Sequence, residues 1–306
     1  MQGNPDEQEP LFSIKTPALI EAYKHLGVDI TSLVGTIPEF LLYRNADGLL
    51  HWHPPVTGDS NFYEMLASAN DWYYARQKAE YEYASTWISK EGINLEVGCG
   101  EGHFADIYNI PNYTGLEINE TAVKKAQHRG LNVLKKDFHE FACRHPQSAH
   151  RLFSFQVVEH LIDPYVYFAS SHLALAEGGL LITSVPAEDS FLSLHPDDPL
   201  NCPPHHITKW TDRCLRNIPE SLGFQFINLY HVPLEQVHQQ WFLQTFLEHV
   251  FLKNTSSPAK NSLSKKQRLA IALFKRIKGL LLSAAQMPPG EFHIPGHTVV
   301  AVHKKI

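Results

Sequence analysis

The chain has 306 residues, 43% of them apolar, and a formal net charge of −6 at pH 7. This composition is enough for one large or two modest globular domains, and the acidic balance argues against nucleic acid as a partner. The polar, acidic start lacks the features of a secretory signal, and no apolar run is long enough for a transmembrane helix. The four cysteines form no Cys-x-x-Cys pair, so we expect reduced thiols and a cytoplasmic protein.

Residues 1–90 are expected to form an N-terminal extension that acts as a lid. The segment is rich in aromatic residues, and the Pro54-Pro55 pair marks a loop within it. Residues 70–89 combine aromatic residues and alanine at helical spacing with charged residues, which predicts one long helix.

From residue 91 short apolar runs alternate with helical patterns. The predicted strands are residues 93–97, 113–117, 132–136, 151–157 and 180–185. A helix is expected to begin at Asp163 and to end at the Gly178-Gly179 pair. This alternation predicts an α/β fold with a parallel sheet covered by helices on both faces.

The C-terminal part adds two further predicted strands, which bring the sheet to seven. A helix over 209–221 leads into a strand at 223–232, and the last strand falls at 297–303. Between them, residues 233–291 are expected to be a helical insertion, with one helix over 237–252 and a second over 265–282. Residues 91–232 and 292–306 would then form one doubly wound core.

The stretch NLEVGCGEGHF, residues 94–104, places three glycines between a strand and a helix. Such a loop lets backbone approach a ligand at the carboxyl edge of the sheet. A P-loop is excluded because no Lys-Ser or Lys-Thr pair follows. A dinucleotide fingerprint is disfavoured because His103 stands where its third glycine belongs.

The same stretch resembles the E/D-x-G-x-G-x-G signature of class I S-adenosylmethionine-dependent methyltransferases. Glu117 ends the next strand, where that family places an acid on the ribose, and Asp137-Phe138 follows the third strand, near the adenine. The resemblance implies a Rossmann-like methyltransferase fold, S-adenosylmethionine (SAM) as cofactor, and these cofactor-binding residues: Glu96, Gly98, Cys99, Gly100, Gly102, Glu117, Ile118, Asp137, Phe138 and Gln156.

Two looser resemblances concern the acceptor of the methyl group. QVVEHLIDP, residues 156–164, is similar to a motif of the branch that includes quinone-biosynthesis O-methyltransferases. DGLLHWHPPVTGDSNFYEML and DWYYARQKAEYEYA resemble segments of bacterial methyltransferases found with glycan-assembly enzymes. They suggest a sugar or glycolipid hydroxyl as acceptor, with Tyr63, Trp72, Tyr73 and Tyr74 either stacking on it or packing the extension onto the sheet.

Four residues are candidates for catalysis by acid–base chemistry. Glu159 and His160 follow the fourth strand, and His205 and His206 lie on the loop after the fifth, all on the expected substrate side. The alternative is structural, with Glu159 or His160 shaping the loop and one of the two later histidines capping the next helix.

We expect no metal site, although the chain has 19 histidines. His51 and His53 share one face of a predicted strand, but no cysteine or acid accompanies them at ligand spacing. Relatives of this group sometimes carry a cysteine-rich zinc ribbon in the corresponding region, which here lacks cysteine.

The predicted helix over 265–282 carries six lysines and arginines and no acid around an apolar face. It is either a peripheral membrane contact or a helical cap or dimer contact with a solvated basic face. Three functions stay open: a glycan-directed methyltransferase, a methyltransferase of quinones or small aromatics, and a non-catalytic SAM-binding partner subunit. The oligomeric state is not predicted.

Overall fold

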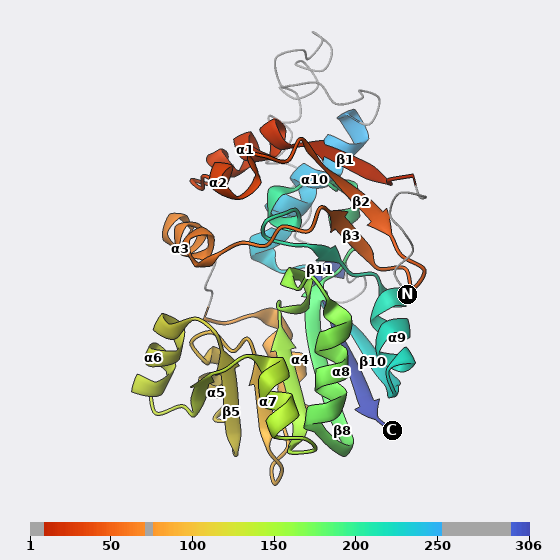
Figure 1. Cartoon of the computed structure of the whole chain (residues 1–306). Coiled ribbons are helices and arrows are strands. Elements are labelled where there is room, and N and C mark those ends of the chain that lie inside the picture. The colour runs from red at the N-terminus through yellow and green to blue at the C-terminus, as the bar shows by residue number, and fades with distance from the viewer. Residues whose placement is uncertain (1–8, 71–75, 253–294) are drawn as a thin grey trace.

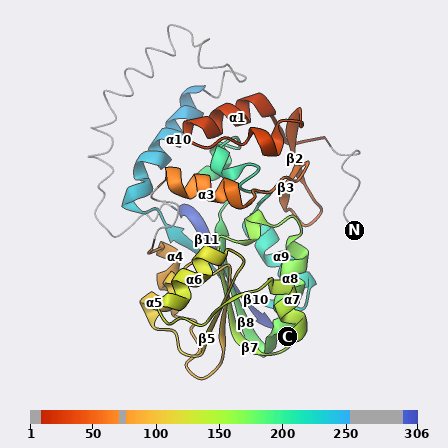
Figure 2. The same cartoon turned by 60° about the vertical axis from the view of Figure 1, so that its left-hand side comes forward.

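The computed structural model describes residues 9–70, 76–252 and 295–306. These residues form two β-sheets, a four-stranded and a seven-stranded one. The smaller sheet lies in the upper part of Figure 1 and the larger one in the lower part, and both carry helices against their faces (Figures 1 and 2).

The larger sheet has the strand order β10-β11-β8-β7-β4-β5-β6. Its strands are β4 (Asn94–Val97), β5 (Tyr113–Glu117), β6 (Val133–Lys135), β7 (Ala149–Phe155), β8 (Leu175–Pro186), β10 (Phe224–Pro233) and β11 (Pro295–Lys305). The five from β4 to β8 are parallel, and β11 pairs antiparallel with both β8 and β10. The predicted doubly wound, seven-stranded and mostly parallel sheet is therefore confirmed.

Helices cover both faces of this sheet, as the alternating pattern predicted. One face carries α7 (Phe138–Arg144), α8 (Pro164–Ala174) and α9 (Asp212–Ser221), and the other α4 (Ala79–Ser85), α5 (His103–Tyr108) and α6 (Glu120–His128). Neighbours on a strand point to opposite faces. Leu152 accordingly packs in one core cluster and Phe153 in the other, both with at most 1% exposure.

The smaller sheet has the order β1-β2-β3-β9 and is antiparallel. Its elements are β1 (Phe12–Lys15), α1 (Thr16–His25), α2 (Thr31–Val34), β2 (Glu39–Arg44), β3 (Leu50–His53), α3 (Ser60–Ala69) and β9 (Thr208–Lys209). On β3, Leu50 and Trp52 face a core that Tyr23 and Phe62 share, which leaves His51 and His53 on the outer face. Since β9 comes from the chain after β8, the two sheets are tied together by that segment.

Four short 3-10 turns and one further helix complete the described elements. They are η2 (Val158–His160), η3 (Phe191–Leu194), η4 (Pro199–Asn201), η5 (Gln236–His238) and α10 (Gln239–Leu252). The helix predicted over 237–252 is confirmed by α10, whereas the one predicted over 265–282 lies outside the described residues. None of the helices in the described ranges combines the length and apolar character needed to cross a bilayer.

The predicted end of the helix at Gly178-Gly179 is wrong, because α8 ends at Ala174 and β8 begins at Leu175. In the pairing with β7, Ala149 lies opposite Leu175 but Arg151 lies opposite Leu180, so residues 176–179 bulge out of the ladder. Gly178 has a φ of 72°, which a residue without a β-carbon adopts at low cost. The glycines therefore mark a bulge rather than a helix end.

The predicted helix over 70–89 is also too long. Residues 71–75, with Trp72, Tyr73 and Tyr74, lie outside the described residues, and α4 begins only after an extended Lys78. At the other end, the hydroxyls of Ser85 and Thr86 donate to the carbonyls of Glu82 and Tyr83. Such local bonds compete with helix propagation, which is why the helix stops there.

Candidate active site

The glycine loop after β4 has three left-handed residues, with φ values of 66° at Gly98, 53° at Gly100 and 76° at Gly102. A β-carbon on Gly98 would lie 2.5 Å from Val157 Cγ2, and one on Gly102 would lie 2.6 Å from Leu131 Cδ1. Gly100 differs, because no atom of the described residues lies within 4 Å of a β-carbon there. Two glycines therefore serve packing, while the middle one borders open space where a ligand can approach.

Glu117, at the end of β5, faces this loop. Its Oε2 accepts a hydrogen bond from the Gly100 amide at 2.9 Å, and its Oε1 accepts from the amides of Ile118 and Asn119 at 2.8 Å each. A carboxylate has about four acceptor positions, so capacity remains for a further donor. Beside it, the apolar side chain of Ile118 is 73% exposed, which suits the face of a flat ring.

Glu96 lies beneath the loop rather than in front of it. Its side chain is 2% exposed, and Oε2 accepts a hydrogen bond of 2.6 Å from the phenol of Tyr113. Burial raises the pKa of Glu96 to about 8, and it also raises the pKa of the neighbouring Cys99 thiol. Both residues support the loop from inside the protein.

Asp137 and Phe138 stand where β6 passes into α7. Asp137 Oδ1 caps the helix by accepting from the Glu140 amide at 2.9 Å, and its side chain remains exposed at the sheet edge. Phe138 packs against Tyr167, with the ring centroids 5.6 Å apart. Both lie on the same edge as the glycine loop, since the strands that carry them are parallel.

Gln156 follows β7 with a φ of 57° and belongs to a polar group that the sequence did not reveal. Its Nε2 donates to Glu80 Oε1 at 3.3 Å and to Ser184 Oγ at 3.4 Å. Glu80 is 5% exposed and comes from α4, in the stretch predicted to be a long helix. Nothing in the sequence around Glu80 indicates that this helical acid is buried at the sheet edge.

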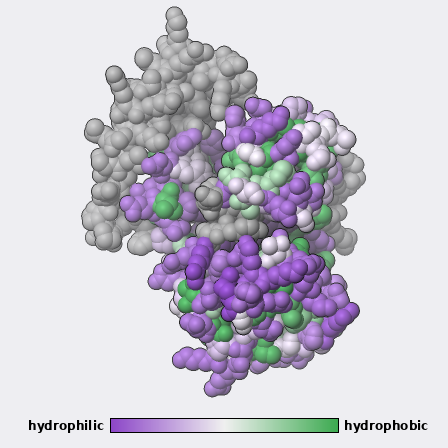
Figure 3. All heavy atoms as spheres, turned by 90° about the vertical axis from the view of Figure 1, so that its left-hand side faces the viewer, coloured by the Kyte–Doolittle hydropathy of each residue, from purple (hydrophilic) through white to green (hydrophobic). Residues whose placement is uncertain are grey.

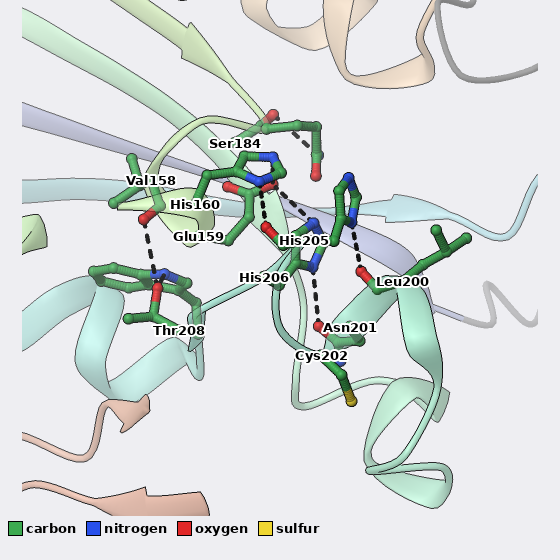
Figure 4. A network of polar contacts seen from close by, with 12 residues as sticks. Val158, Glu159, His160, Ser184, Leu200, Asn201, Cys202, His205, His206 and Thr208 are labelled. Carbon is green, nitrogen blue, oxygen red and sulfur yellow. Dashed lines mark hydrogen bonds and ion pairs between the residues drawn. The ribbon is translucent and has the colours of Figure 1, made fainter. Parts of the chain in front are cut away.

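The four catalytic candidates form one cluster, which Figure 4 shows from close by. One ring nitrogen from each of His160, His205 and His206 lies within 4.8 Å of the others. Glu159 Oε1 lies 4.0 Å from His160 Nε2 and 3.9 Å from His206 Nε2. The end of β7 and the loop after η4 thus bring together the residues that the sequence singled out.

Hydrogen bonds hold all three histidine rings by the same nitrogen. His160 Nδ1 lies 2.6 Å from the His205 carbonyl oxygen, and His205 Nδ1 lies 2.8 Å from the Leu200 carbonyl oxygen. His206 Nδ1 lies 3.2 Å from Asn201 Oδ1. Since these oxygens only accept, Nδ1 carries the proton in each neutral ring. Burial lowers the pKa of His160 to about 4 and of His205 to about 3, so both rings are neutral at pH 7.

The carboxylate of Glu159 is buried in the cluster without a hydrogen bond from the described residues. Its side chain is fully buried, and neither carboxylate oxygen has a hydrogen-bond partner among the described residues. Burial raises the pKa of Glu159 to about 8. Only the backbone is anchored, because the Ile207 amide donates to the Glu159 carbonyl at 2.8 Å.

The N-terminal part contributes Tyr63, whose hydroxyl lies 3.3 Å from His160 Nδ1. The ring also stands edge-on to His160, at a centroid distance of 5.9 Å. The sequence suggests Tyr63 for a lid or for packing, but its pairing with His160 across 97 residues of chain could not be read there.

Val157 connects the two halves of the site. It packs against Gly98 and immediately precedes η2, which carries Glu159 and His160. The glycine loop and the histidine cluster are therefore neighbours at the carboxyl edge, across the point where the chain order reverses between β4 and β7. Ligands of open α/β sheets bind in such a crevice.

A family model described as a methyltransferase domain matches residues 70–229 of the 306, which is more than half of the chain. A probable S-adenosylmethionine-dependent methyltransferase of Mycolicibacterium smegmatis is 28% identical over 175 residues. One from Mycobacterium tuberculosis is 26% identical over 185 residues. The matches cover 56% and 58% of this chain and 65% of each relative, so the chain spans slightly less than two thirds of their length.

Solved structures share the fold at low identity. A SAM-dependent methyltransferase from Archaeoglobus fulgidus aligns with a TM-score of 0.52 and 19% identity, over 81% of this chain and 100% of that one. A possible histamine N-methyltransferase from Thermotoga maritima aligns with a TM-score of 0.51 and 18% identity, over 80% and 98%. By its sheet order, its glycine loop and the match of the family model, the chain belongs to the methyltransferase domain family.

Proposed function

We propose that the protein transfers a methyl group from SAM to a hydroxyl acceptor. The observation that carries this proposal is the pairing of Gly100 with Glu117. The space in front of Gly100 is open, and the carboxylate of Glu117 borders it while holding the loop by its amide. A nucleoside can enter there with its ribose hydroxyls against an acid that still has acceptor capacity.

The remaining nucleoside contacts follow from the same edge. The exposed Ile118 offers an apolar face to one side of an adenine ring, and Phe138 lies at the end of the neighbouring strand. The exposed carboxylate of Asp137 can accept from the adenine amine. We assign cofactor contact to these residues together with the three glycines, and a supporting role to Glu96 and Cys99.

Two charged residues near α4 suit the amino acid end of the cofactor. The ammonium of Lys78 acts electrostatically on Glu96, Glu159 and His160, so it lies near the site. Glu80 is buried beside Gln156 at the same edge. We propose that Lys78 attracts the carboxylate of SAM and that Glu80 accepts from its ammonium group.

The acceptor is proposed to lie on the side of the histidine cluster. Bound SAM supplies a methyl group activated by a positively charged sulfur, so the protein has mainly to align the acceptor oxygen and exclude water. Tyr63 and the rest of residues 9–70 are proposed to serve as the lid over that side, next to the core of residues 91–232. A sugar or glycolipid hydroxyl and a cytoplasmic location remain predictions from the sequence.

Isothermal titration with SAM and with its demethylated product tests the cofactor step first. Binding of both at one site per chain is expected, and absence of binding would overturn the proposal. A screen with methyl-labelled SAM then tests the acceptor, with nucleotide sugars, glycolipids and catechols in parallel. Label on catechols alone would point to an aromatic acceptor, and binding without any transfer would point to a non-catalytic subunit.

A further inference from the structure

We propose that His160, His205 and His206, together with Glu159, bind a divalent transition-metal ion. Glu159 and His160 come from η2 and the other two residues from the loop after η4, yet one ring nitrogen of each histidine lies within 4.8 Å of the others, and Glu159 Oε1 lies within 4.0 Å of two of the rings (Figure 4). No other group of three or more His, Cys, Asp or Glu side chains within the described ranges lies close enough to hold an ion. This site departs from the expectation drawn from the sequence, which weighed only His51 and His53.

The tautomer of the rings is the first argument. In each histidine the Nδ1 proton is engaged by an oxygen, from the His205 carbonyl, the Leu200 carbonyl or the Asn201 side chain. The lone pair of each ring is therefore on Nε2. Histidines that bind metals are oriented in this way by outer hydrogen-bond acceptors.

The carboxylate of Glu159 is the second argument. An ionised carboxylate without a hydrogen-bond partner in the protein interior is strongly destabilising, because the lost hydration is not replaced. Glu159 is fully buried, and both its oxygens lack such a partner in the part of the chain that the structure describes. A divalent cation between Glu159 and the rings would neutralise this charge and supply the missing contact. A proton does so only in part, since it leaves the second oxygen unbonded.

The spacing requires a modest contraction. In a tetrahedral site with bonds of about 2 Å, the donor atoms lie roughly 3.3 Å apart. The carboxylate-to-ring distances here are 3.9 and 4.0 Å, and the ring nitrogens lie within 4.8 Å. Metal binding would therefore require shifts of the side-chain torsions of these residues, with the Nδ1 hydrogen bonds kept as pivots.

The donor set also selects the class of metal. Three imidazoles with one carboxylate suit Zn²⁺, Co²⁺ or Fe²⁺. Mg²⁺ and Ca²⁺ prefer a shell of oxygen atoms and are disfavoured. If the proposed function holds, an ion here would stand beside the acceptor, and by expanding from four to five ligands it would bind the acceptor oxygen and lower the pKa of that hydroxyl.

The test is made on the full chain without SAM, so that its outcome does not depend on the proposed function. After chelation and desalting, Zn²⁺ and Co²⁺ are titrated, with metal content measured by mass spectrometry and Co²⁺ ligation by visible absorption. One ion per chain is expected in the wild type. The site would be refuted by an absence of stoichiometric binding at micromolar metal.

Two variants and a control identify the ligands. Glu159→Gln and His206→Gln are each expected to weaken metal binding by more than about 100-fold, beyond the usual effect of changes in outer-shell partners. His53→Gln changes an exposed histidine on β3 and should bind metal as the wild type does. Equal affinity in all three variants would place the ion elsewhere and overturn the assignment.

Glu159→Gln also guards against misfolding as the explanation. It keeps the shape of the side chain and replaces a buried ionisable group by a neutral one, so the metal-free variant should melt no lower than the metal-free wild type. Loss of metal binding at an unchanged melting temperature supports the metal site, whereas loss of metal binding in a variant with a lowered melting temperature indicates a folding defect and is resolved by His206→Gln.

Discussion

The side chain of Val157 occupies the place that a β-carbon of Gly98 would need, since such a carbon would lie only 2.5 Å from Val157 Cγ2. This contact joins the loop after β4 to the turn after β7. A larger residue in place of Gly98 would therefore require Val157 to shift, whether or not a ligand is bound. The contact also places η2, with Glu159 and His160, next to the glycine loop.

The two glycines should respond differently to alanine. Gly98→Ala is expected to destabilise the fold by about 2–4 kcal/mol, because overpacking adds to the strain of a left-handed alanine. Gly100→Ala has only the left-handed strain, about 1–2 kcal/mol, but its methyl group enters the open space where a cofactor would lie. Urea unfolding measures the first effect and SAM titration the second.

The paired comparison can fail in a clear way. If Gly100→Ala bound SAM as tightly as the wild type, the space in front of that residue would not be the cofactor site. If Gly98→Ala unfolded at the same urea concentration as the wild type, Val157 would be able to move away.

Glu117→Gln is expected to weaken SAM binding by about 10–100-fold, the range that corresponds to the loss of charge-assisted hydrogen bonds. Glu120→Gln is the matched control, because Glu120 lies on α6 and pairs with Lys124 and Lys135 on the surface. Its affinity should stay within about twofold of the wild type. Equal effects of the two changes would mean that only the general charge of the surface matters.

Glu96 should make stability depend on pH. Burial raises its pKa to about 8 from an ordinary 4.5, so between these values the folded state keeps a proton that the unfolded state has released. The free energy of unfolding therefore falls as pH rises through this window, by up to about 1.4 kcal/mol per pH unit from this group. Glu96→Gln removes that contribution.

Urea unfolding at pH 5.5 and 7.5 checks this expectation. The wild type should lose more stability between the two pH values than Glu96→Gln does. Glu159 has a similarly raised pKa, but it is present in both proteins and cancels in the comparison. Parallel pH profiles would show that Glu96 is ionised in the folded protein at neutral pH.

Tyr23→Phe tests how the N-terminal part holds the loop that leads to His205. The buried hydroxyl of Tyr23 donates to the Pro199 carbonyl at 2.6 Å, so its removal should cost about 1–2 kcal/mol of stability. Tyr83→Phe removes a hydroxyl with an exposed partner, Asn228, and should cost less than about 0.5 kcal/mol. Urea unfolding of the two variants and the wild type measures both losses of stability. Equal losses would contradict the prediction for Tyr23.

Much of the larger sheet could be read from local patterns. The strand predicted at 113–117 has the bounds observed, and the glycine loop lies at the end of the first parallel strand, as expected. Strands of a parallel sheet are buried on both faces, so they stand out as short apolar runs between helical patterns. The Gly178-Gly179 pair led to a wrong prediction of the helix end, since a glycine with positive φ occurs in β-bulges as well as at helix ends.

On the face shown in Figure 3, the upper and lower parts of the molecule differ in the hydropathy of their surface residues. Figure 3 shows a mostly hydrophilic face over the lower part, with hydrophobic residues gathered in places on the upper part.

The small sheet is completed by β9, which follows β8 in the chain and pairs with β3. The sequence indicates that residues 1–90 form an extension. It does not indicate that a strand from the later chain, β9, completes the small sheet, because β pairing depends on spatial proximity and not on local sequence.

The sequence by itself determined the order along the chain of the strands in the larger sheet and the glycine loop after its first strand, because each depends on neighbours within a few positions. Only the tertiary structure brought His160 to His205 and His206, buried Glu159 away from any hydrogen-bond partner in the described ranges, and placed Glu80 beside Gln156. Those contacts join segments many residues apart in the chain. Their geometry depends on how two sheets pack, and the burial that changes the pKa values exists only once they have packed.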